Sequence, residues 1–124
     1  MYSRKSLRTG ERTPDCRSIV AIHGLGGHWR DTWTGDNGKL WLRDSVPLRL
    51  KDSGFNSRVF SYGYDSSTAF SKAVTDITDE AEMLLSRIKG ERKSQAEHHR
   101  PIIFIAHSLG GILVKKVASR SIHL

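Results

Sequence analysis

The 124-residue chain has one cysteine, Cys16, and no apolar stretch that approaches the roughly 18–20 residues of a membrane-spanning helix. An integral membrane protein is therefore excluded, and a single cysteine excludes a secreted scaffold held by internal disulfides. A structural zinc site with several thiolates is not expected either, and we predict neither a metal nor a cofactor. Apolar residues make up 37% and charged residues 27% of the chain, which suits one small folded domain.

Acidic residues are fewer than basic ones: 13 Asp and Glu face 20 Lys and Arg, which gives a formal net charge of +7. Such an excess favours nucleic acid or an anionic surface only where the cations gather on one face. Here half of them lie in two separate segments, residues 1–17 and residues 87–100, each with five basic and two acidic residues. We interpret both as solvated segments and expect no nucleic-acid partner. A surface binder that uses the first segment is the weakest of three functional hypotheses.

Residues 1–17 are polar and aperiodic, and we predict a flexible basic leader before a domain that spans residues 18–124. This leader lacks the apolar segment of a secretory signal. A mitochondrial presequence should be poor in acidic residues, whereas Glu11 and Asp15 interrupt this one. We expect an intracellular, cytoplasmic protein, and leave mitochondrial or endoplasmic reticulum association open.

Apolar runs and helical spacings alternate along the domain. Short apolar runs predict strands at 18–22 and 101–106, the latter continuously apolar as in a strand covered on both faces, and the segment SRVFSY at 57–62 is a further strand candidate. Helices are expected at 40–46, at 70–88 with Gly90 as the end, and at 112–118. This alternation is typical of an α/β fold with a parallel sheet and crossover helices, in which ligands bind beyond the carboxyl ends of the strands.

The segment Ala106-His107-Ser108-Leu109-Gly110 follows the third strand and opens the last helix. It matches the G-x-S-x-G nucleophile elbow with Ala106 in the first glycine position, where a small residue still avoids collision in the tight turn. Such a turn exposes Ser108 above the sheet at the amino end of a helix, where developing negative charge is favoured. The alternative is an ordinary strand-to-helix turn, and we favour the elbow.

The turn His23-Gly24-Leu25-Gly26-Gly27 follows the first strand. Acyl transfer needs two N–H donors aimed at the oxyanion, and the candidates are the backbone N–H groups of Leu109 and Leu25. The glycines let the chain fold back closely enough to present the second donor. A phosphate-binding loop is disfavoured because the spaced G-x-x-x-x-G-K-[ST] pattern is absent.

The pairing of IVAIHGLGG with PIIFIAHSLGG resembles the amino-terminal half of an α/β-hydrolase. Within that superfamily, HGLGGHWRDTW, LWLRD, YGYD and AHSLGG are similar to lipase-like serine esterase domains, which occur alone or fused to NACHT or ankyrin segments in fungal signalling proteins. The resemblance runs from about Ser18 to Ala118. It implies hydrolysis of carboxylic esters or lipids through an acyl-serine at Ser108, with the oxyanion held by Leu25 and Leu109.

The same resemblance implies supporting roles around the turn and the elbow, for His23, Gly24, His107 and Gly110. It also implies an ester or lipid substrate, without a transmembrane segment. Peripheral contact with a membrane and association with a larger signalling protein are further expectations that it carries.

The acid and base of a catalytic triad have no matching positions in this chain. In this fold the nucleophile precedes the acid, which precedes the histidine. No Asp or Glu follows Ser108, and the one downstream histidine, His123, would lie about 22 Å away along a helix. Upstream, His23 and His28 are candidate bases, although the resemblance implies a structural role for His23. Of the others, we expect a turn residue at Asp65 and solvent-facing side chains at His98 and His99.

Two hypotheses therefore stay open. The first is a serine esterase truncated before its acid and base, so that the 124-residue chain alone is inactive. The second is a non-catalytic regulatory or interaction module that keeps the hydrolase fold. Under the first, three tryptophans either line an acyl pocket or cover apolar surface: Trp29, Trp33 and Trp41. Under both, an incomplete sheet leaves one strand edge unpaired.

Overall fold

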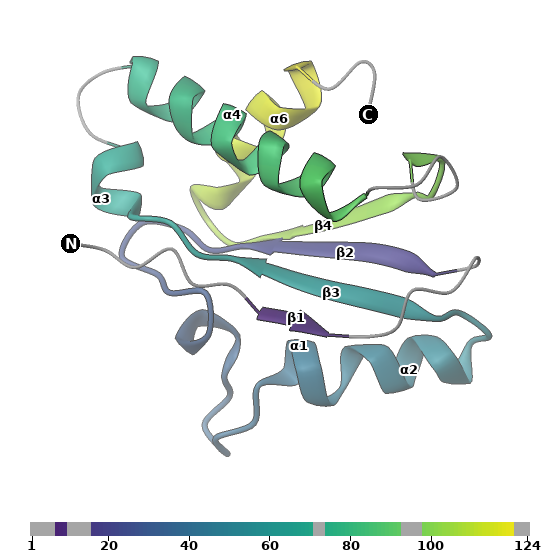
Figure 1. Ribbon diagram of the computed structural model, residues 1–124. Coiled ribbons are helices and arrows are strands. Elements are labelled where there is room, and N and C mark those ends of the chain that lie inside the picture. The colour runs from purple at the N-terminus through teal and green to yellow at the C-terminus, as the bar shows by residue number, and fades with distance from the viewer. Residues whose placement is uncertain (1–6, 10–15, 71–73, 93–97, 121–124) are drawn as a thin grey trace.

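The computed structural model describes residues 7–9, 16–70, 74–92 and 98–120. Their sheet has the strand order β1-β3-β2-β4, formed by β1 (Leu7–Thr9), β2 (Arg17–Ile22), β3 (Ser57–Tyr62) and β4 (Ile102–Ala106). β2 lies between β3 and β4 and is parallel to both. The expected parallel sheet with crossover helices is confirmed, with its three parallel strands where the apolar runs predict them (Figure 1).

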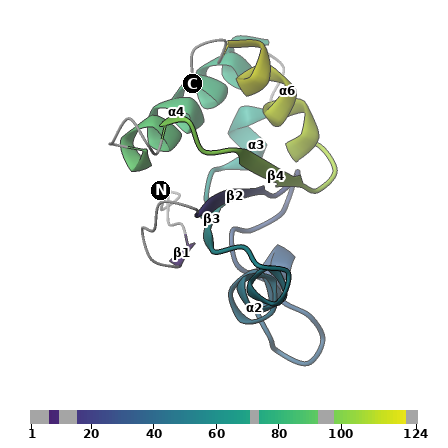
Figure 2. The same cartoon turned by 90° about the vertical axis from the view of Figure 1, so that its right-hand side faces the viewer.

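Helices cover both faces of this sheet. One face carries α3 (Ser66–Ala69), α4 (Val74–Glu91) and α6 (Gly110–Arg120). The other carries the short helix η1 (Asp31–Trp33), α1 (Trp41–Asp44) and α2 (Val46–Asp52). Figure 2 shows α4 and α6 on one side of the strands and α2 on the other. The arrangement has three layers, helix, sheet and helix, as expected for crossovers on both faces.

Alternate residues of β2 feed two separate cores. Val20 and Ile22 pack with α4 and α6 residues such as Leu84 and Leu113. Ile19 and Ala21 point to the opposite face and pack with the residues of η1 and α1, including Trp33. Because side chains alternate along a strand, β2 is buried on both sides and its apolar run is continuous.

The leader is a correction to the sequence prediction. Within residues 1–17, expected to lack regular structure, Leu7–Thr9 form β1, and β2 begins at Arg17 rather than at Ser18. β1 pairs antiparallel with β3, with Leu7 opposite Ser61 and Thr9 opposite Val59. The outer edge of β3 presents unpaired backbone groups, and three residues are enough to pair with them. The rest of the predicted leader, apart from Cys16, lies outside the described residues.

β4 also differs from expectation. Its continuously apolar sequence predicts a strand covered on both faces, yet Ile103 is 43% exposed. The reason is its position, because β2 flanks it on one side and the described sheet ends there. The expected open sheet edge is thus β4.

The boundaries of the long helix differ from the expected ones. The 70–88 spacing predicts one helix, but Phe70 caps α3 and α4 begins at Val74. Gly90, expected to end the helix, lies inside it. The predicted stripe still faces the core, where Ala81, Leu84 and Ile88 are buried.

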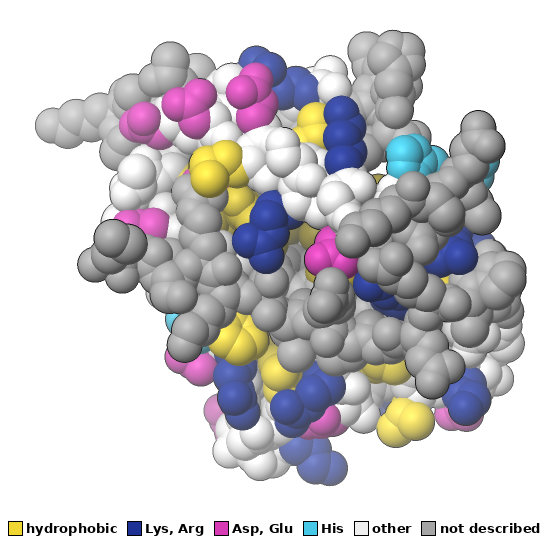
Figure 3. All heavy atoms as spheres, viewed as in Figure 1, with side chains coloured by type: hydrophobic (Ala, Val, Ile, Leu, Met, Phe, Trp, Pro, Cys, Tyr) yellow, Lys and Arg dark blue, Asp and Glu magenta, His cyan; other side chains and the backbone are white. Residues whose placement is uncertain are grey.

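The surface is mixed in charge, and no described helix is both long enough and apolar enough to cross a membrane. On the face shown in Figure 3, basic side chains of the described residues alternate with acidic and apolar ones. Arg120, for example, pairs with Glu82 across α6 and α4, with 2.6 Å between Nη1 and Oε1.

We expect the α6 packing to hold the carboxyl end of β4 in place. Leu113 is fully buried, so Leu113→Ala should lower the free energy of unfolding by about 2–5 kcal/mol. The neighbouring Ile112 is 43% exposed, and Ile112→Ala should cost less than about 1 kcal/mol. Chemical denaturation of both variants measures the difference. Equal losses would contradict the placement of α6.

Candidate active site

The candidate site lies where β2 and β4 end side by side. Ile22 pairs with Ala106 as the last step of the ladder, and His107 N–H then donates to the Ile22 carbonyl oxygen at 3.1 Å. Beyond this point the β2 chain continues toward α1 and α2 on one face, whereas β4 leads into α6 on the other (Figure 2). A crevice at such a divergence is where open α/β sheets bind ligands.

Ser108 occupies a strained corner between β4 and α6. Its φ is 54°, and it is the only non-glycine residue with a positive φ in the described part of the chain. An L-residue in this left-handed region costs about 1–2 kcal/mol. Hydrogen bonds hold the corner: Gly110 N–H donates to His107 at 3.0 Å and Gly111 N–H donates to Ser108 at 3.1 Å. Ser108 is exposed, and its hydroxyl has no hydrogen-bond partner among the described residues.

Two glycines bring the turn after β2 into direct contact with this corner. A Cβ added to Gly24 would lie 2.7 Å from the His107 carbonyl oxygen and 2.9 Å from the Ser108 Cβ. A Cβ on Gly110 would lie 2.6 Å from the His23 carbonyl oxygen and closer still to that of Ile22. Only residues without a side chain permit these approaches. The turn at 23–27 and the elbow at 106–110 therefore meet at one end of the sheet.

The backbone N–H groups proposed as oxyanion donors both lack acceptors within the described residues. Gly26 N–H donates to the Ser66 Oγ at 2.9 Å and Gly27 N–H to the Gly24 carbonyl at 3.0 Å. The N–H groups of Leu25 and Leu109 make no such bond to any described residue. The Leu109 nitrogen lies 3.3 Å from the position of a Cβ on Gly24, so it borders the same turn. Two unpaired amides next to an exposed serine can stabilise an anionic oxygen there.

His23 supports the turn from inside the core. Its ring is fully buried and stacks on Tyr64 with 4.3 Å between centroids. The His23 Nδ1 lies 2.9 Å from the Gly24 carbonyl oxygen, and Nε2 is buried without a hydrogen-bond partner. Burial lowers the pKa of His23 below the ordinary 6.5, because the charged ring would lose its hydration. A neutral His23 that donates from Nδ1 to Gly24 fits these contacts.

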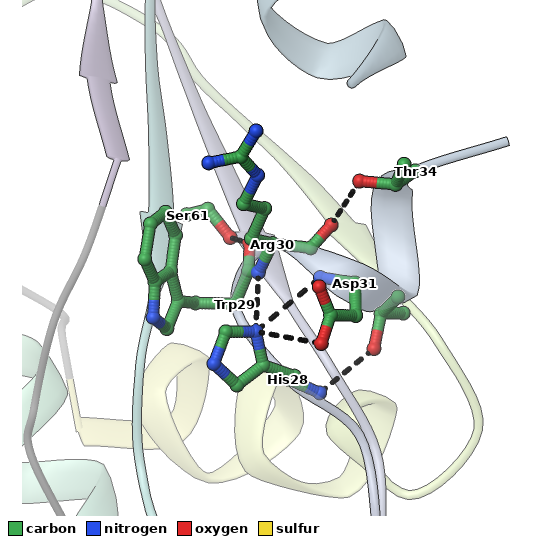
Figure 4. A network of polar contacts seen from close by, with 7 residues as sticks. His28, Trp29, Arg30, Asp31, Thr34 and Ser61 are labelled. Carbon is green, nitrogen blue, oxygen red and sulfur yellow. Dashed lines mark hydrogen bonds and ion pairs between the residues drawn. The ribbon is translucent and has the colours of Figure 1, made fainter. Parts of the chain in front are cut away.

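His28 lies in the next turn and does not contact Ser108. Its Nδ1 accepts from the backbone N–H groups of Arg30 at 3.1 Å and Asp31 at 3.3 Å (Figure 4). With Nδ1 as acceptor, the neutral ring carries its proton on Nε2. A triad base needs the opposite tautomer, with Nδ1–H donating to a carboxylate. The Asp31 carboxylate is 3.6 Å from Nδ1, too far for a hydrogen bond. This arrangement caps η1 rather than activating a serine.

The other candidate residues from the sequence lie in different parts of the fold. Asp65 caps α3 by accepting from Ser67, whose hydroxyl is 2.6 Å away and lowers the pKa of this carboxyl. The predicted turn role of Asp65 agrees with this geometry. His107 is exposed beside Ser108, while His98 and His99 are exposed at the amino end of β4, far along the strand from Ser108.

The tryptophans divide between two environments. Trp33 is buried and packs edge-on against Trp41 at 5.6 Å between centroids, in the core on the α1 side of the sheet. Trp29 is half-buried, and its carbonyl accepts from the Ser61 hydroxyl (Figure 4). The Trp33 and Trp41 contacts match the structural alternative, in which these rings cover apolar surface.

A separate cavity of about 430 Å³ lies between α4 and the sheet. The residues that line it include Arg87, Glu91 and Arg92. Glu91 pairs with Arg58 at 3.5 Å, and Arg92 donates to the His98 and Arg100 carbonyls at 2.7 Å. These charged groups serve the fold, and the cavity is distinct from the corner at Ser108.

Two residues that contact the turn after β2, Tyr64 and Ser66, were not identified as part of the site from the sequence. Tyr64, placed in a loop by the sequence, is fully buried and donates from its hydroxyl to the His23 carbonyl at 2.5 Å. Ser66 accepts from Gly26. Both residues are about forty positions from the turn that they contact. The sequence signals near them are the predicted strand that they follow and, for Tyr64, the YGYD segment of the resemblance.

Comparisons with known proteins do not assign the chain. No family model matches it, and neither a curated protein nor a solved structure does. The described residues also hold no group of three or more His, Cys, Asp or Glu side chains that could bind a metal ion.

We predict that Gly110 is intolerant of a methyl group. Gly110→Ala places a Cβ against two backbone oxygens and should lower the free energy of unfolding by about 1–3 kcal/mol. Gly111 has open space around its Cα, so Gly111→Ala should raise it by about 0.5–1 kcal/mol through helix propensity. Chemical denaturation distinguishes the two, and equal effects would argue against the close approach of β2 and β4.

The lowered pKa of His23 predicts a pH-dependent stability. As pH falls below the ordinary 6.5, the unfolded chain takes up this proton before the folded protein does, so the free energy of unfolding decreases. This loss continues until pH reaches the folded-state pKa. His23→Phe keeps a stacked ring but cannot titrate, so its stability should fall less steeply between about pH 7 and pH 5.

Denaturation at several pH values measures these slopes, with His99→Gln as a control for an exposed histidine. The control should follow the wild-type slope. Identical slopes for wild type and His23→Phe would show that His23 is not the source.

Proposed function

We propose that this protein is a serine hydrolase that cleaves carboxylic esters, lipids included, through an acyl-serine at Ser108. The observation that carries the proposal is the strained, exposed Ser108 placed against a glycine turn, with unpaired N–H groups at Leu25 and Leu109. Strain at a non-glycine residue persists where the surrounding structure enforces it, and it concentrates at functional sites. The resemblance to lipase-like serine esterases of the α/β-hydrolase superfamily supports the same reaction.

In the proposed reaction, the Ser108 Oγ attacks the ester carbonyl carbon while its proton passes to a base. The carbonyl oxygen becomes an oxyanion that accepts hydrogen bonds from the Leu25 and Leu109 N–H groups. Collapse of this intermediate breaks the bond to the alcohol, which leaves with the proton. Water then attacks the acyl-serine, and the acid is released with Ser108 restored.

The amino end of α6 favours the charge that develops in this step. α6 has 11 residues and begins at Gly110, two positions after Ser108. Unsatisfied N–H groups at a helix start carry a partial positive charge. Loss of one oxyanion donor costs well-studied hydrolases about 3–4 kcal/mol, so the two amides would supply a large share of the rate.

A general base is the part that the described residues do not supply. His28 holds the wrong tautomer, and the Nε2 of His23 is buried without a hydrogen bond to the serine. No described histidine or carboxylate forms a hydrogen bond with the Ser108 hydroxyl. This observation favours a second candidate function, a non-catalytic regulatory or interaction module that retains the corner without turnover.

A fluorophosphonate probe tests the proposal. We expect a covalent adduct on Ser108, formed about a hundredfold faster than on exposed serines such as Ser67 and Ser119, because phosphonylation uses the same oxyanion donors. Peptide mass spectrometry locates the adduct. Ser108→Ala should abolish it and Ser119→Ala should leave it intact. In a chain extended to full domain length, a Ser108 as unreactive as Ser119 would favour the non-catalytic module.

A further inference from the structure

The segment that follows β3 is tied to the turn after β2 at two points. The Tyr64 hydroxyl donates to the His23 carbonyl at 2.5 Å, and the Ser66 Oγ accepts from Gly26 N–H at 2.9 Å. His23 precedes Gly24 and Leu25, and Gly26 follows them. The two hydrogen bonds therefore hold both ends of the short stretch that presents the Leu25 N–H.

Within this stretch Gly24 packs against His107 and Ser108, whereas Leu25 and Gly26 have little packing of their own. Leu25 is 57% exposed, and Gly26 has a φ of +72° with nothing within 4 Å of the position that its Cβ would take. Glycines on both sides of Leu25 give the backbone more conformational freedom than other residues would. Side-chain packing does not hold the Leu25 amide here, so its direction depends on hydrogen bonds. The Gly24 carbonyl of the same peptide accepts from Gly27 N–H and lies 2.9 Å from His23 Nδ1. The bonds made by Tyr64 and Ser66 fix the two adjoining peptides.

Tyr64 and Ser66, which make these two hydrogen bonds, are themselves held in place by their surroundings. Tyr64 is fully buried and stacks between His23, at 4.3 Å, and Tyr62, at 5.6 Å between centroids. Ser66 is 6% exposed and is the first residue of α3, which Asp65 caps. Hydrogen bonds from such anchored groups restrict a flexible turn at low entropic cost, because the anchors lose little further freedom.

We propose that Tyr64 and Ser66 are positioning residues that aim the Leu25 N–H at the oxyanion. The inference rests on the proposed hydrolase function and deepens it by assigning two residues that touch neither the serine nor the substrate. Each removes one degree of freedom from the turn: Tyr64 sets the plane of the His23–Gly24 peptide, and Ser66 sets that of the Leu25–Gly26 peptide. With either bond absent, the Leu25 N–H rotates away from Ser108 for part of the time.

The chain offers matched controls for both residues. Tyr64→Phe removes only a hydroxyl, and Tyr62→Phe removes the equivalent hydroxyl from the neighbouring buried ring, which donates to Glu80 instead. Ser66→Ala removes the acceptor of Gly26, and Ser67→Ala removes the adjacent hydroxyl, which donates to Asp65. Each control loses a hydrogen bond of similar kind without touching the turn.

Two measurements on the full chain decide the question. Amide hydrogen exchange of the segment 23–27 should rise at least about fivefold in Tyr64→Phe and Ser66→Ala, the factor that corresponds to one typical hydrogen bond. In the Tyr62→Phe and Ser67→Ala controls it should stay at the wild-type level. The rate of fluorophosphonate reaction at Ser108 should fall about tenfold in the first pair and stay unchanged in the second.

These outcomes separate the inference from the function on which it rests. Equal exchange of the turn amides in variants and controls would overturn the positioning role, whatever the reactivity of Ser108. Faster exchange with an unchanged phosphonylation rate would overturn it too, because the turn would then move without consequence for the oxyanion. A Ser108 that does not react in a chain extended to full domain length defeats the hydrolase function itself, together with the role assigned here. Denaturation of all four variants shows whether any change follows from global stability alone.

Discussion

The close approach of two backbones, at the carboxyl ends of β2 and β4, is the constraint on which the site depends. Gly24 lies against His107 and Ser108, and Gly110 lies against the carbonyls of Ile22 and His23. Neither approach leaves room for a Cβ. Since β2 and β4 are adjacent and parallel, their loops leave from the same edge of the sheet, and the two glycines remove the last atoms that would keep these loops apart.

The burial of α6 compensates for the backbone strain at Ser108. The left-handed φ of 54° is unfavourable for serine, and a glycine at this position would relieve it. The helix that follows buries Leu113 and Val117 completely, and this burial outweighs a cost of about 1–2 kcal/mol. A chain that needed only to join β4 to α6 would gain stability from a glycine here. The retained hydroxyl therefore favours a chemical role for Ser108 over a purely structural one.

Most of the sheet was predictable because β2 and β4 are short, largely apolar runs and β3 is a short segment rich in β-formers, each flanked by polar segments and turn residues. β1 was not, because Leu7–Thr9 owe their strand to the free edge of β3, which is a tertiary effect. The edge position of β4 was missed since its composition equals that of a strand buried on both faces. In the candidate site, the G-x-S-x-G pattern led to Ser108, and the glycine-rich sequence after the first predicted strand led to the turn at 23–27.

Tyr64 and Ser66 could not be found in that way. Their contacts with His23 and Gly26 arise because β3 lies beside β2, and local sequence patterns do not predict the order of strands in a sheet. Local patterns locate a residue that performs chemistry, because the chemistry restricts its neighbours along the chain. Residues that hold such a group in place are restricted only by their neighbours in space.

The histidines illustrate how environment divides roles among identical side chains. Burial lowers the pKa of His23, and its Nε2 is buried without a hydrogen bond to Ser108, so this ring shapes the turn through Nδ1 rather than exchanging protons with the serine. His28 is half-buried, and two backbone N–H groups occupy its Nδ1 and fix the unsuitable tautomer. The glycine turn occupies one side of Ser108 and α6 rises from another. A base for the proposed reaction must therefore reach the hydroxyl from its exposed side, where the described residues leave it uncovered.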